Sequence, residues 1–174
     1  MTAAVFLDRD DTLILDTGYM YKPEEFAWKQ GAEDSLRLFK KLGLPVFIIT
    51  NQGGIARGYF TEAQMHLFHD KLLAETGKIG GVITDIAFCP HHPLSVTPAL
   101  KTPCECRKPE PGMLISLAEK WQLDLSRSVV IGDKASDSEA GQAAGCASYL
   151  VGKNQSLLEV AEQALADTGW LAQD

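Results

Sequence analysis

Three short apolar segments, each ending abruptly in polar residues, constrain the fold of this chain more than any other feature. They cover residues 3–7, 45–49 and 129–131, are rich in β-branched or aromatic residues, and lack polar alternation. Such runs are typical of strands in a parallel sheet that is covered on both faces. We therefore expect a parallel sheet at the centre of the protein, with polar residues at the carboxyl ends of its strands.

Amphipathic segments separate these strands. Apolar residues at helical spacing, with a capping residue at Thr61 and a stop signal at Gly43, indicate helices. The expected helices cover residues 33–42, a segment that opens at Thr61, and residues 113–121, 137–144 and 156–166; further strands are expected at 85–88 and 147–151. This alternation predicts an α/β fold, a doubly wound and mainly parallel sheet between helices, as one domain over residues 1–174.

Charge and composition argue against several classes of protein. The chain has 174 residues and a formal net charge of -7, and its longest basic clusters are the pairs Lys40-Lys41 and Arg107-Lys108. Nucleic acid is therefore not an expected partner. No apolar stretch is long enough to span a bilayer, and no secretory signal precedes the first predicted strand. We expect a cytoplasmic monomer that acts on a small molecule.

Acidic and hydroxyl side chains follow three of the predicted strands: Asp8 and Asp10 the first, Thr50 the second and Asp133 the third. Because the carboxyl ends of parallel strands meet at one edge of a sheet, we expect these residues to converge. Carboxylates at i and i+2 repel unless a cation lies between them, and Mg²⁺ prefers such oxygen ligands. A carboxylate can also attack phosphorus, so the pattern predicts magnesium-assisted phosphoryl transfer, with Lys108 neutralising charge.

Four motifs in this order resemble the haloacid dehalogenase phosphatase superfamily over nearly the whole chain. They are Asp8-Arg9-Asp10-Asp11-Thr12, Thr50-Asn51-Gln52, Arg107-Lys108-Pro109 and Gly132-Asp133-Lys134. Three further segments look, more narrowly, like the D-glycero-D-manno-heptose 1,7-bisphosphate phosphatases: Gly53-Gly54-Ile55-Ala56-Arg57-Gly58, Cys89-Pro90-His91-His92-Pro93 and Cys104-Glu105-Cys106-Arg107-Lys108-Pro109. The resemblance implies a phosphatase that removes the 7-phosphate of this heptose bisphosphate through an aspartyl-phosphate intermediate.

The resemblance also implies a role for each matching residue. Asp8 would be the nucleophile, Asp10 the acid and base, and Thr50 and Lys108 the groups that hold phosphate. The Mg²⁺ ligands would be Asp8, the backbone carbonyl of Asp10, and Asp133, with Asp137 supporting them from outside. The implied substrate contacts are Asp16, Thr17, Gly18, Tyr19, Asn51, Gln52, Gly53, Arg57, Arg107 and Lys134.

One residue departs from the pattern, since Asp11 stands where the family has glycine. Aspartate tolerates left-handed backbone better than most residues, so we expect the turn to survive at modest cost. An extra carboxylate beside the metal would weaken phosphate binding or alter the metal preference. We therefore expect reduced but real activity.

A polar loop over residues 89–106 carries two pairs of potential metal ligands. Cys89 with His91, and Cys104 with Cys106, are spaced i and i+2, so each pair can grip one ion from extended backbone. Three thiolates and an imidazole suit tetrahedral Zn²⁺ in a closed, structural site. His92 is the alternative imidazole, but His91 matches the ligand position of the family. Zinc would then hold in place the two residues that follow Cys106.

The remaining histidines and cysteine receive no chemical role. His66 and His69 fall on a predicted helix, where we expect them to be solvated. Cys146 precedes a predicted strand, where we expect a buried packing role.

The spacing of the motifs leaves no room for an inserted cap domain, so specificity must come from loops: residues 16–21, residues 53–57 and the zinc loop. Arg57, Arg107 and Lys134 supply more positive charge than one phosphate requires, which favours a bisphosphorylated sugar, although Arg57 could instead form a surface ion pair.

Other functions stay open from the sequence. A histidinol-phosphate phosphatase would share the superfamily motifs and a similar zinc loop, but residues 54–58 favour the heptose branch. A non-catalytic phosphoacceptor or metal-binding regulatory module is the alternative of another class, and Asp10, Lys108 and Asp133 together argue against it. A zinc-dependent nucleic-acid binder is disfavoured by the acidic charge.

Overall fold

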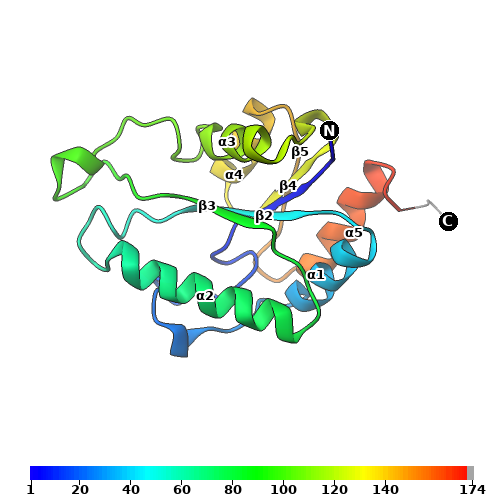
Figure 1. The fold of residues 1–174 in the computed structure, drawn as a ribbon, viewed down its shortest axis with the longest axis horizontal. Coiled ribbons are helices and arrows are strands. Elements are labelled where there is room, and N and C mark those ends of the chain that lie inside the picture. The colour runs from blue at the N-terminus through cyan, green and yellow to red at the C-terminus, as the bar shows by residue number, and fades with distance from the viewer. Residues whose placement is uncertain (172–174) are drawn as a thin grey trace.

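The computed structural model, which describes residues 1–171, contains a five-stranded sheet in the order β3-β2-β1-β4-β5, with every neighbouring pair parallel. The strands are β1 (Val5–Leu7), β2 (Val46–Asn51), β3 (Asp85–Cys89), β4 (Val129–Gly132) and β5 (Ala147–Leu150). The chain runs from the central strand β1 outward to β3, and then returns to the other side of β1 to form β4 and β5 (Figure 1).

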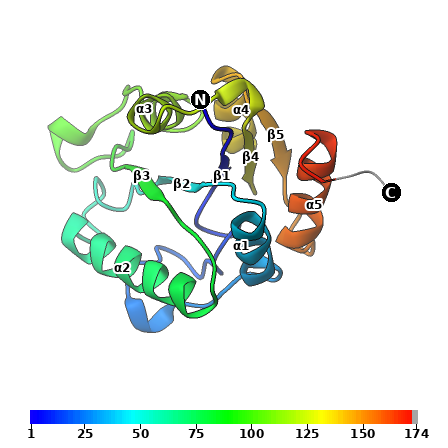
Figure 2. The ribbon, with the colours of Figure 1, turned by 45° about the vertical axis from the view of Figure 1, so that its right-hand side comes forward.

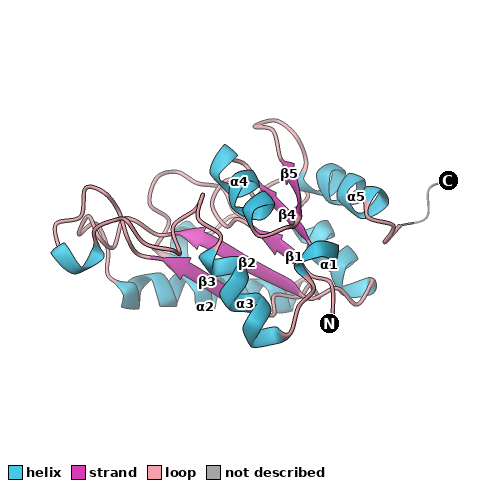
Figure 3. Cartoon of the chain, turned by 90° about the horizontal axis from the view of Figure 1, so that it is seen from above, coloured by secondary structure: helices cyan, strands magenta, loops and turns pink. Residues whose placement is uncertain are grey.

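Helices cover both faces of the sheet, as Figures 2 and 3 show. They are α1 (Ala32–Lys41), α2 (Glu62–Lys78) and α5 (Leu157–Asp167) on one face, and α3 (Gly112–Trp121) and α4 (Ala135–Ala143) on the other. Short 3-10 turns at Pro23–Glu25, Pro98–Leu100 and Leu125–Arg127 lie in the connections. The loop after β3 projects beyond the sheet (Figure 1).

The buried core has two parts because the strands are apolar on both faces. Val5 and Leu7 point into the cluster beneath α1, α2 and α5, whereas Phe6 points into the cluster beneath α3 and α4. These three side chains are at most 1% exposed. Full burial of such a side chain contributes about 1.5–3 kcal/mol to folding. This apolar sandwich makes the sheet rigid up to its carboxyl edge.

The strand order brings separate polar segments together. Leu7 pairs with Ile131, so the residues that follow β1 and β4 leave the sheet side by side. The amide of Asp8 donates to the carbonyl of Ile131 at 3.0 Å, which extends this pairing by one residue. Here the chain direction across the sheet reverses, which is where open α/β sheets place their ligands.

The predicted fold class is confirmed, and the predicted elements are present with shifts of a few residues at their ends. The capping box at Thr61 is present: the Gln64 amide donates to Thr61 Oγ1 at 3.2 Å, and the Thr61 amide donates to Gln64 Oε1 at 2.9 Å. Among residues 1–171, no helix combines the length and the apolar character that crossing a membrane requires.

Candidate active site

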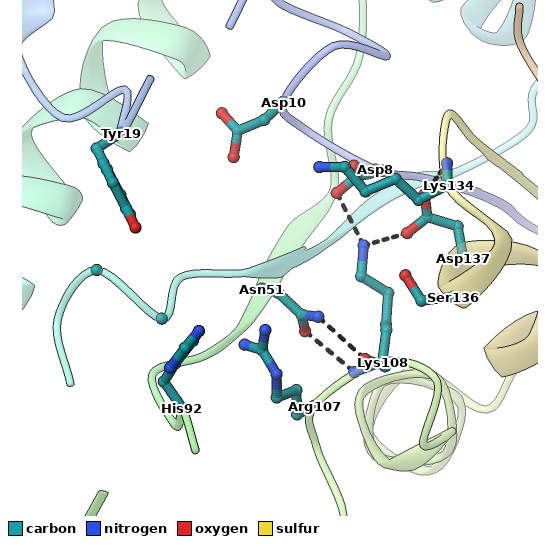
Figure 4. A pocket seen from close by; sticks show the side chains of 12 residues that line it. Asp8, Asp10, Tyr19, Asn51, His92, Arg107, Lys108, Lys134, Ser136 and Asp137 are labelled. Carbon is teal, nitrogen blue, oxygen red and sulfur yellow. Dashed lines mark hydrogen bonds and ion pairs between the residues drawn. The ribbon is translucent and has the colours of Figure 1, made fainter. Parts of the chain in front are cut away.

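A cavity of about 380 Å³ opens at the carboxyl edge of the sheet (Figure 4). Its walls come from the ends of β1, β2 and β4, from the loop before α3 and from the start of α4. The lining residues are Asp8, Asp10, Tyr19, Asn51, Gly53, Gly54, His92, Arg107, Lys108, Lys134, Ser136 and Asp137. Segments that are distant in the sequence therefore form one polar pocket.

Lys108 forms the electrostatic centre of this pocket. Its Nζ donates to Asp8 Oδ1 at 2.8 Å and to the carbonyl of Ile49 at 2.8 Å, and lies 2.6 Å from Asp137 Oδ1. Lys108 is only 4% exposed. Burial alone would lower the pKa of Lys108, but the charges of Asp8 and Asp137 raise it above its ordinary value. The ammonium therefore stays charged beside the Asp8 carboxylate and orients it.

The backbone of Lys108 is held by the last residue of β2. Asn51 Nδ2 donates to the carbonyl of Lys108 at 3.1 Å, and the amide of Lys108 donates to Asn51 Oδ1 at 3.0 Å. Figure 4 shows this two-point contact beneath the cavity. Asn51 was expected to contact substrate; its amide fixes the lysine, and the residue also lines the cavity.

Three carboxylates meet beside the lysine. One carboxylate oxygen from each of Asp8, Asp133 and Asp137 lies within 4.8 Å of the other two. Burial, and then the negative charge of Asp8, raise the pKa of Asp133 to about 7. Such crowding of anions is unfavourable without a cation, and an all-oxygen donor set is the kind that Mg²⁺ takes. The residues present therefore fit a magnesium ion.

The environments of these carboxylates differ. Thr12 Oγ1 donates to Asp133 Oδ1 at 3.3 Å. Asp137 uses both of its oxygens within the protein, since Oδ1 pairs with Lys108 and Oδ2 accepts from the backbone amide of Lys134 at 3.0 Å. This arrangement is consistent with the expected supporting place of Asp137 behind the metal ligands.

Asp10 lies apart from this cluster, across the cavity in Figure 4. Its carboxylate accepts hydrogen bonds from Arg9 at 2.9–3.1 Å and from Gln52 Nε2 at 3.0 Å. Burial raises the pKa of Asp10 above its ordinary value, while the charge of Arg9 opposes this shift. A carboxyl group whose pKa is raised is suited to acid and base catalysis.

Thr50, a predicted phosphate-holding residue, is fully buried at the end of β2. Its Oγ1 accepts a hydrogen bond from Gln52 Nε2 at 2.8 Å, and the same nitrogen also contacts Asp10. Thr50 therefore lies beneath Gln52 and is not among the residues that line the cavity.

Some of the predicted substrate contacts line a cavity, whereas Thr17 and Arg57 do not. An adjoining cavity of about 250 Å³ is lined by a set that includes Asp16, Gly18, Tyr19, Gln52, Gly53 and Lys134. Thr17 points its hydroxyl at the sulfur of Met20, at 3.4 Å, and lines neither cavity. Arg57 also stays outside both cavities and donates to the Tyr19 hydroxyl at 2.7 Å, with its guanidinium 4.7 Å from the centre of the Tyr59 ring. Arg57 therefore contacts Tyr19, which lines both cavities.

Arg107 and His92 close the outer wall. Arg107 lines the cavity and donates to the carbonyl of His91 at 3.0 Å. A Cβ atom at Gly53 would lie 2.8 Å from the His92 ring and 3.1 Å from Arg107 Nη1. Only glycine at this position allows both side chains to come so close to the loop after β2.

Sequence reasoning missed several residues of the site. His92 was considered only as an alternative zinc ligand, and Ser136 was not singled out, yet both line the cavity. Arg9 is fully buried between the two principal aspartates, a position that no local pattern indicates. The expectation that His69 is solvated is wrong: it is 5% exposed and contacts Arg9. His66, by contrast, has an exposed side chain.

The predicted zinc ligands come together. One ligand atom from each of Cys89, His91, Cys104 and Cys106 lies within 4.8 Å of the other three. Cys104 Sγ is 3.7 Å from both other sulfurs, close to the roughly 3.8 Å that a tetrahedron with zinc–sulfur bonds of about 2.3 Å requires. Cys106 Sγ and Cys89 Sγ are closer, at 2.8 Å. These residues therefore fit a tetrahedral metal ion. The histidine of the cluster is His91, the preferred candidate, and not His92.

Comparisons with known proteins agree with this geometry. A family model described as "HAD-hyrolase-like" matches residues 105–170. The D-glycero-beta-D-manno-heptose-1,7-bisphosphate 7-phosphatase of Rhodopseudomonas palustris is 44% identical over 142 residues, 82% of this chain and 79% of the relative. The D-glycero-alpha-D-manno-heptose-1,7-bisphosphate 7-phosphatase of Photorhabdus laumondii is 41% identical over 80% of this chain and 76% of the relative.

A solved structure extends the agreement to three dimensions. The D,D-heptose 1,7-bisphosphate phosphatase from B. bronchiseptica, complexed with magnesium and phosphate, matches with a TM-score of 0.82 and 31% identity over 95% of this chain and 99% of that chain. The parallel sheet and the acidic strand ends define a phosphatase of the haloacid dehalogenase class. Within that class, the chain belongs to the D-glycero-D-manno-heptose 1,7-bisphosphate 7-phosphatase family. The resemblance inferred from the motifs is confirmed.

Proposed function

We propose that this protein removes the 7-phosphate of D-glycero-D-manno-heptose 1,7-bisphosphate, with Asp8 as the nucleophile. The observation that carries the proposal is the convergence of Asp8, Asp133 and Lys108 at the carboxyl edge of the sheet, where Asp8 and Lys108 line the cavity and Asp133 lies beside Asp8. This convergence supplies a carboxylate poised for attack, a place for a cation and a fixed positive charge. The proposed setting is the cytoplasm and the proposed form a monomer, as expected from the sequence.

The proposed chemistry has two steps. An oxygen of Asp8 attacks phosphorus, the bond between phosphorus and the sugar oxygen breaks, and Asp10 gives its proton to that oxygen. A water molecule then attacks the phosphorus of the aspartyl phosphate and loses a proton to Asp10, while the bond to Asp8 breaks and inorganic phosphate leaves. The ammonium of Lys108 stabilises the phosphoryl oxygens in both steps.

Two metal ions complete the proposal. Mg²⁺ would be held by Asp8, Asp133 and the backbone carbonyl of Asp10, and would neutralise charge on the transferring group. Zn²⁺ would be held by the four residues of the cysteine and histidine cluster, where it would have a structural role. In support, the relative from B. bronchiseptica was solved with magnesium and phosphate.

A second phosphate on the substrate accounts for the positive charge around the cavity. Arg107 and Lys134 line it in addition to Lys108, and Figure 4 shows all three side chains around the cavity. A bisphosphate would bind through the second group while the first is cleaved. The relatives carry names for both anomers of the heptose bisphosphate.

The test compares both anomers of the heptose bisphosphate with the two monophosphates and with histidinol phosphate. We expect kcat/KM for one bisphosphate anomer to exceed that for either monophosphate by about 100-fold, because the second phosphate contributes about 2.7 kcal/mol of binding. Equal values would exclude the bisphosphate as the preferred substrate, and a preference for histidinol phosphate would favour the alternative phosphatase.

An Asp8→Asn variant is the control for the reaction type. It keeps the shape of the side chain but cannot form an acyl phosphate by carboxylate attack, so phosphate release should stop. Release of phosphate from a generic ester by the wild-type protein with Mg²⁺ separates an enzyme from a non-catalytic phosphoacceptor, which would release none.

A further inference from the structure

The most deeply buried charge of the site belongs to a residue that the proposed chemistry does not use. Arg9 lies between the two catalytic aspartates in sequence and is 0% exposed. Its Nε and Nη2 atoms donate to the Asp10 carboxylate at 2.9–3.1 Å, and Nη2 also donates to the carbonyl of Met20 at 2.8 Å. Arg9 therefore ties the acid and base residue to the end of the loop that contains Tyr19.

The opposite side of the guanidinium is held by helix α2. Arg9 Nη1 lies 3.1 Å from His69 Nε2, and the guanidinium carbon lies 4.8 Å from the centre of the Phe68 ring. Both aromatic residues are buried on consecutive positions of this helix. The guanidinium is thus fixed by a hydrogen-bond partner at one edge and by a ring at its face.

The chemistry of the two groups determines the tautomer of the histidine. A guanidinium has donors and no acceptor, so Nε2 of His69 must accept the hydrogen bond. The imidazole is then neutral, with its proton on Nδ1. Burial, followed by the charges of Arg9 and His66, lowers the pKa of His69 to about 3, which agrees with the geometry.

A purely structural role would not require this particular residue. A buried guanidinium needs partners for its donors. Apolar residues of similar volume at positions 9 and 69 would fill the same space without burying a charge. The pair is useful if the direction of the guanidinium matters. The guanidinium donates to the Asp10 carboxyl group, so its direction bears on where that group lies. Figure 4 shows the Asp10 carboxyl group at the cavity.

We propose that His69 is a positioning residue for the acid and base step: it accepts from Arg9 and so fixes the guanidinium that places Asp10. This proposal rests on the proposed function and adds to it a residue on α2, outside the cavity wall. Loss of the acceptor would let the Arg9 guanidinium rotate, and the Asp10 carboxyl group would then lose its defined position. Binding of substrate and of metal would be affected less.

The test uses the fact that only poor leaving groups need a proton. In His69→Leu, the rate of the first turnover with an alkyl phosphate such as the sugar substrate should fall by about tenfold or more, since positioned acid catalysis contributes about 100-fold or more. Release of p-nitrophenolate in the first turnover should stay within about twofold, because this leaving group departs without a proton. KM should change less than kcat for the sugar substrate.

Two matched variants separate positioning from packing. His69→Gln offers an amide oxygen to Arg9 and should restore most of the rate with the sugar substrate, whereas His66→Leu changes an exposed histidine on the same helix and should have no effect. Equal losses for both esters in His69→Leu, no rescue by glutamine, or wild-type rates in His69→Leu would each overturn the proposal.

A measurement on the wild-type protein covers the case in which His69→Leu does not fold. Nitrogen chemical shifts of the His69 ring at neutral pH should show a proton on Nδ1 and an unprotonated Nε2 that accepts a hydrogen bond, and a proton on Nε2 would overturn the proposal. The proposed function fails separately, if the wild-type protein releases phosphate from neither ester.

Discussion

At the scale of single residues, close approach of backbone and side chain shapes this site. A Cβ atom at Gly132 would lie 2.3–2.4 Å from Asp137, so only glycine at the end of β4 lets that carboxylate reach both Lys108 and the amide of Lys134. The glycine in the fourth motif is therefore required by packing. Asp11 shows the opposite case, because a side chain stands where the backbone is left-handed, with a φ of 57°.

Asp11 adds a carboxylate to the turn without disrupting it. Its Oδ1 accepts from the amide of Asp16 at 3.3 Å and from Lys29 at 3.5 Å, so the turn expected from the sequence is present. The charge also faces a cavity that Asp133 lines. The turn is thus intact, so any effect of Asp11 on activity is expected to come from its charge and not from a change in the backbone.

We expect Asp11→Gly to raise kcat/KM by about 3- to 10-fold at saturating Mg²⁺, since removing a negative charge near the metal ligands favours binding of an anionic substrate by about 1 kcal/mol. Asp11→Asn keeps a residue that tolerates the left-handed turn and removes only the charge, so it should show a similar gain. Steady-state kinetics of the three proteins decide the question. Unchanged turnover in Asp11→Gly would show that the charge has no effect.

At the scale of elements, the loop over residues 89–106 joins the predicted zinc ligands to the predicted phosphate-holding lysine. It leaves the end of β3 and returns to the sheet at Arg107 and Lys108, immediately after Cys106. Burial raises the pKa of Cys89, so its thiolate needs a cation beside it. Lys108, the proposed phosphate-holding residue, therefore follows directly on the last of the four potential metal ligands.

Removal of one thiol should impair catalysis from a distance. We expect a folded Cys106→Ala protein to lose zinc and to lose kcat/KM by at least about tenfold, because Lys108 would no longer be held beside Asp8. Cys146→Ala is the matched control, since Cys146 is buried outside the cluster and should affect neither zinc content nor rate. Metal analysis and kinetics on the same samples provide the measurement. A zinc-free Cys106→Ala protein with wild-type kcat/KM would contradict the expectation.

Prediction of the elements succeeded where the signal was local. The helix that opens at Thr61 begins with the expected capping box, and the apolar strands are buried as expected. Helical spacing places Trp121 on the apolar face of the helix over residues 113–121, yet Trp121 is 43% exposed and its Nε1 donates to Asp85 at 2.8 Å. A polar partner on another element changed its direction, and periodicity does not record such partners.

At the scale of the whole molecule, assembly of the active site works against stability in the absence of metal. The sheet forces Asp8, Asp133 and Asp137 together, and Lys108 compensates only part of the charge. The pKa of Asp133 is raised in the folded protein, so folding is favoured most when this group is protonated. This contribution is complete below pH of about 4 and is lost as pH rises to about 7.

We therefore expect Asp133→Asn to stabilise the protein in magnesium-free buffer at pH 8, by about 1–2 kcal/mol relative to its effect at pH 4, because Asp133 is only half buried and solvent screens part of the repulsion. Chemical denaturation at the two pH values, without chelator so that zinc is retained, gives the comparison. With added Mg²⁺ the wild-type protein should become more stable than Asp133→Asn, since only the wild-type protein binds the ion well. A difference that does not change with pH would contradict this account.

The sequence by itself determined the order of strands and helices, the acidic strand ends, the two thiol pairs and the family, because periodicity, spacing of i and i+2 and ordered motifs are local properties. Only the tertiary structure decided which side chains meet across long separations. Arg9 meets His69 and Asn51 meets Lys108 because the sheet order places β1, α2 and the loop over residues 89–106 around one edge. Such contacts depend on packing in three dimensions, which no single segment of the chain specifies.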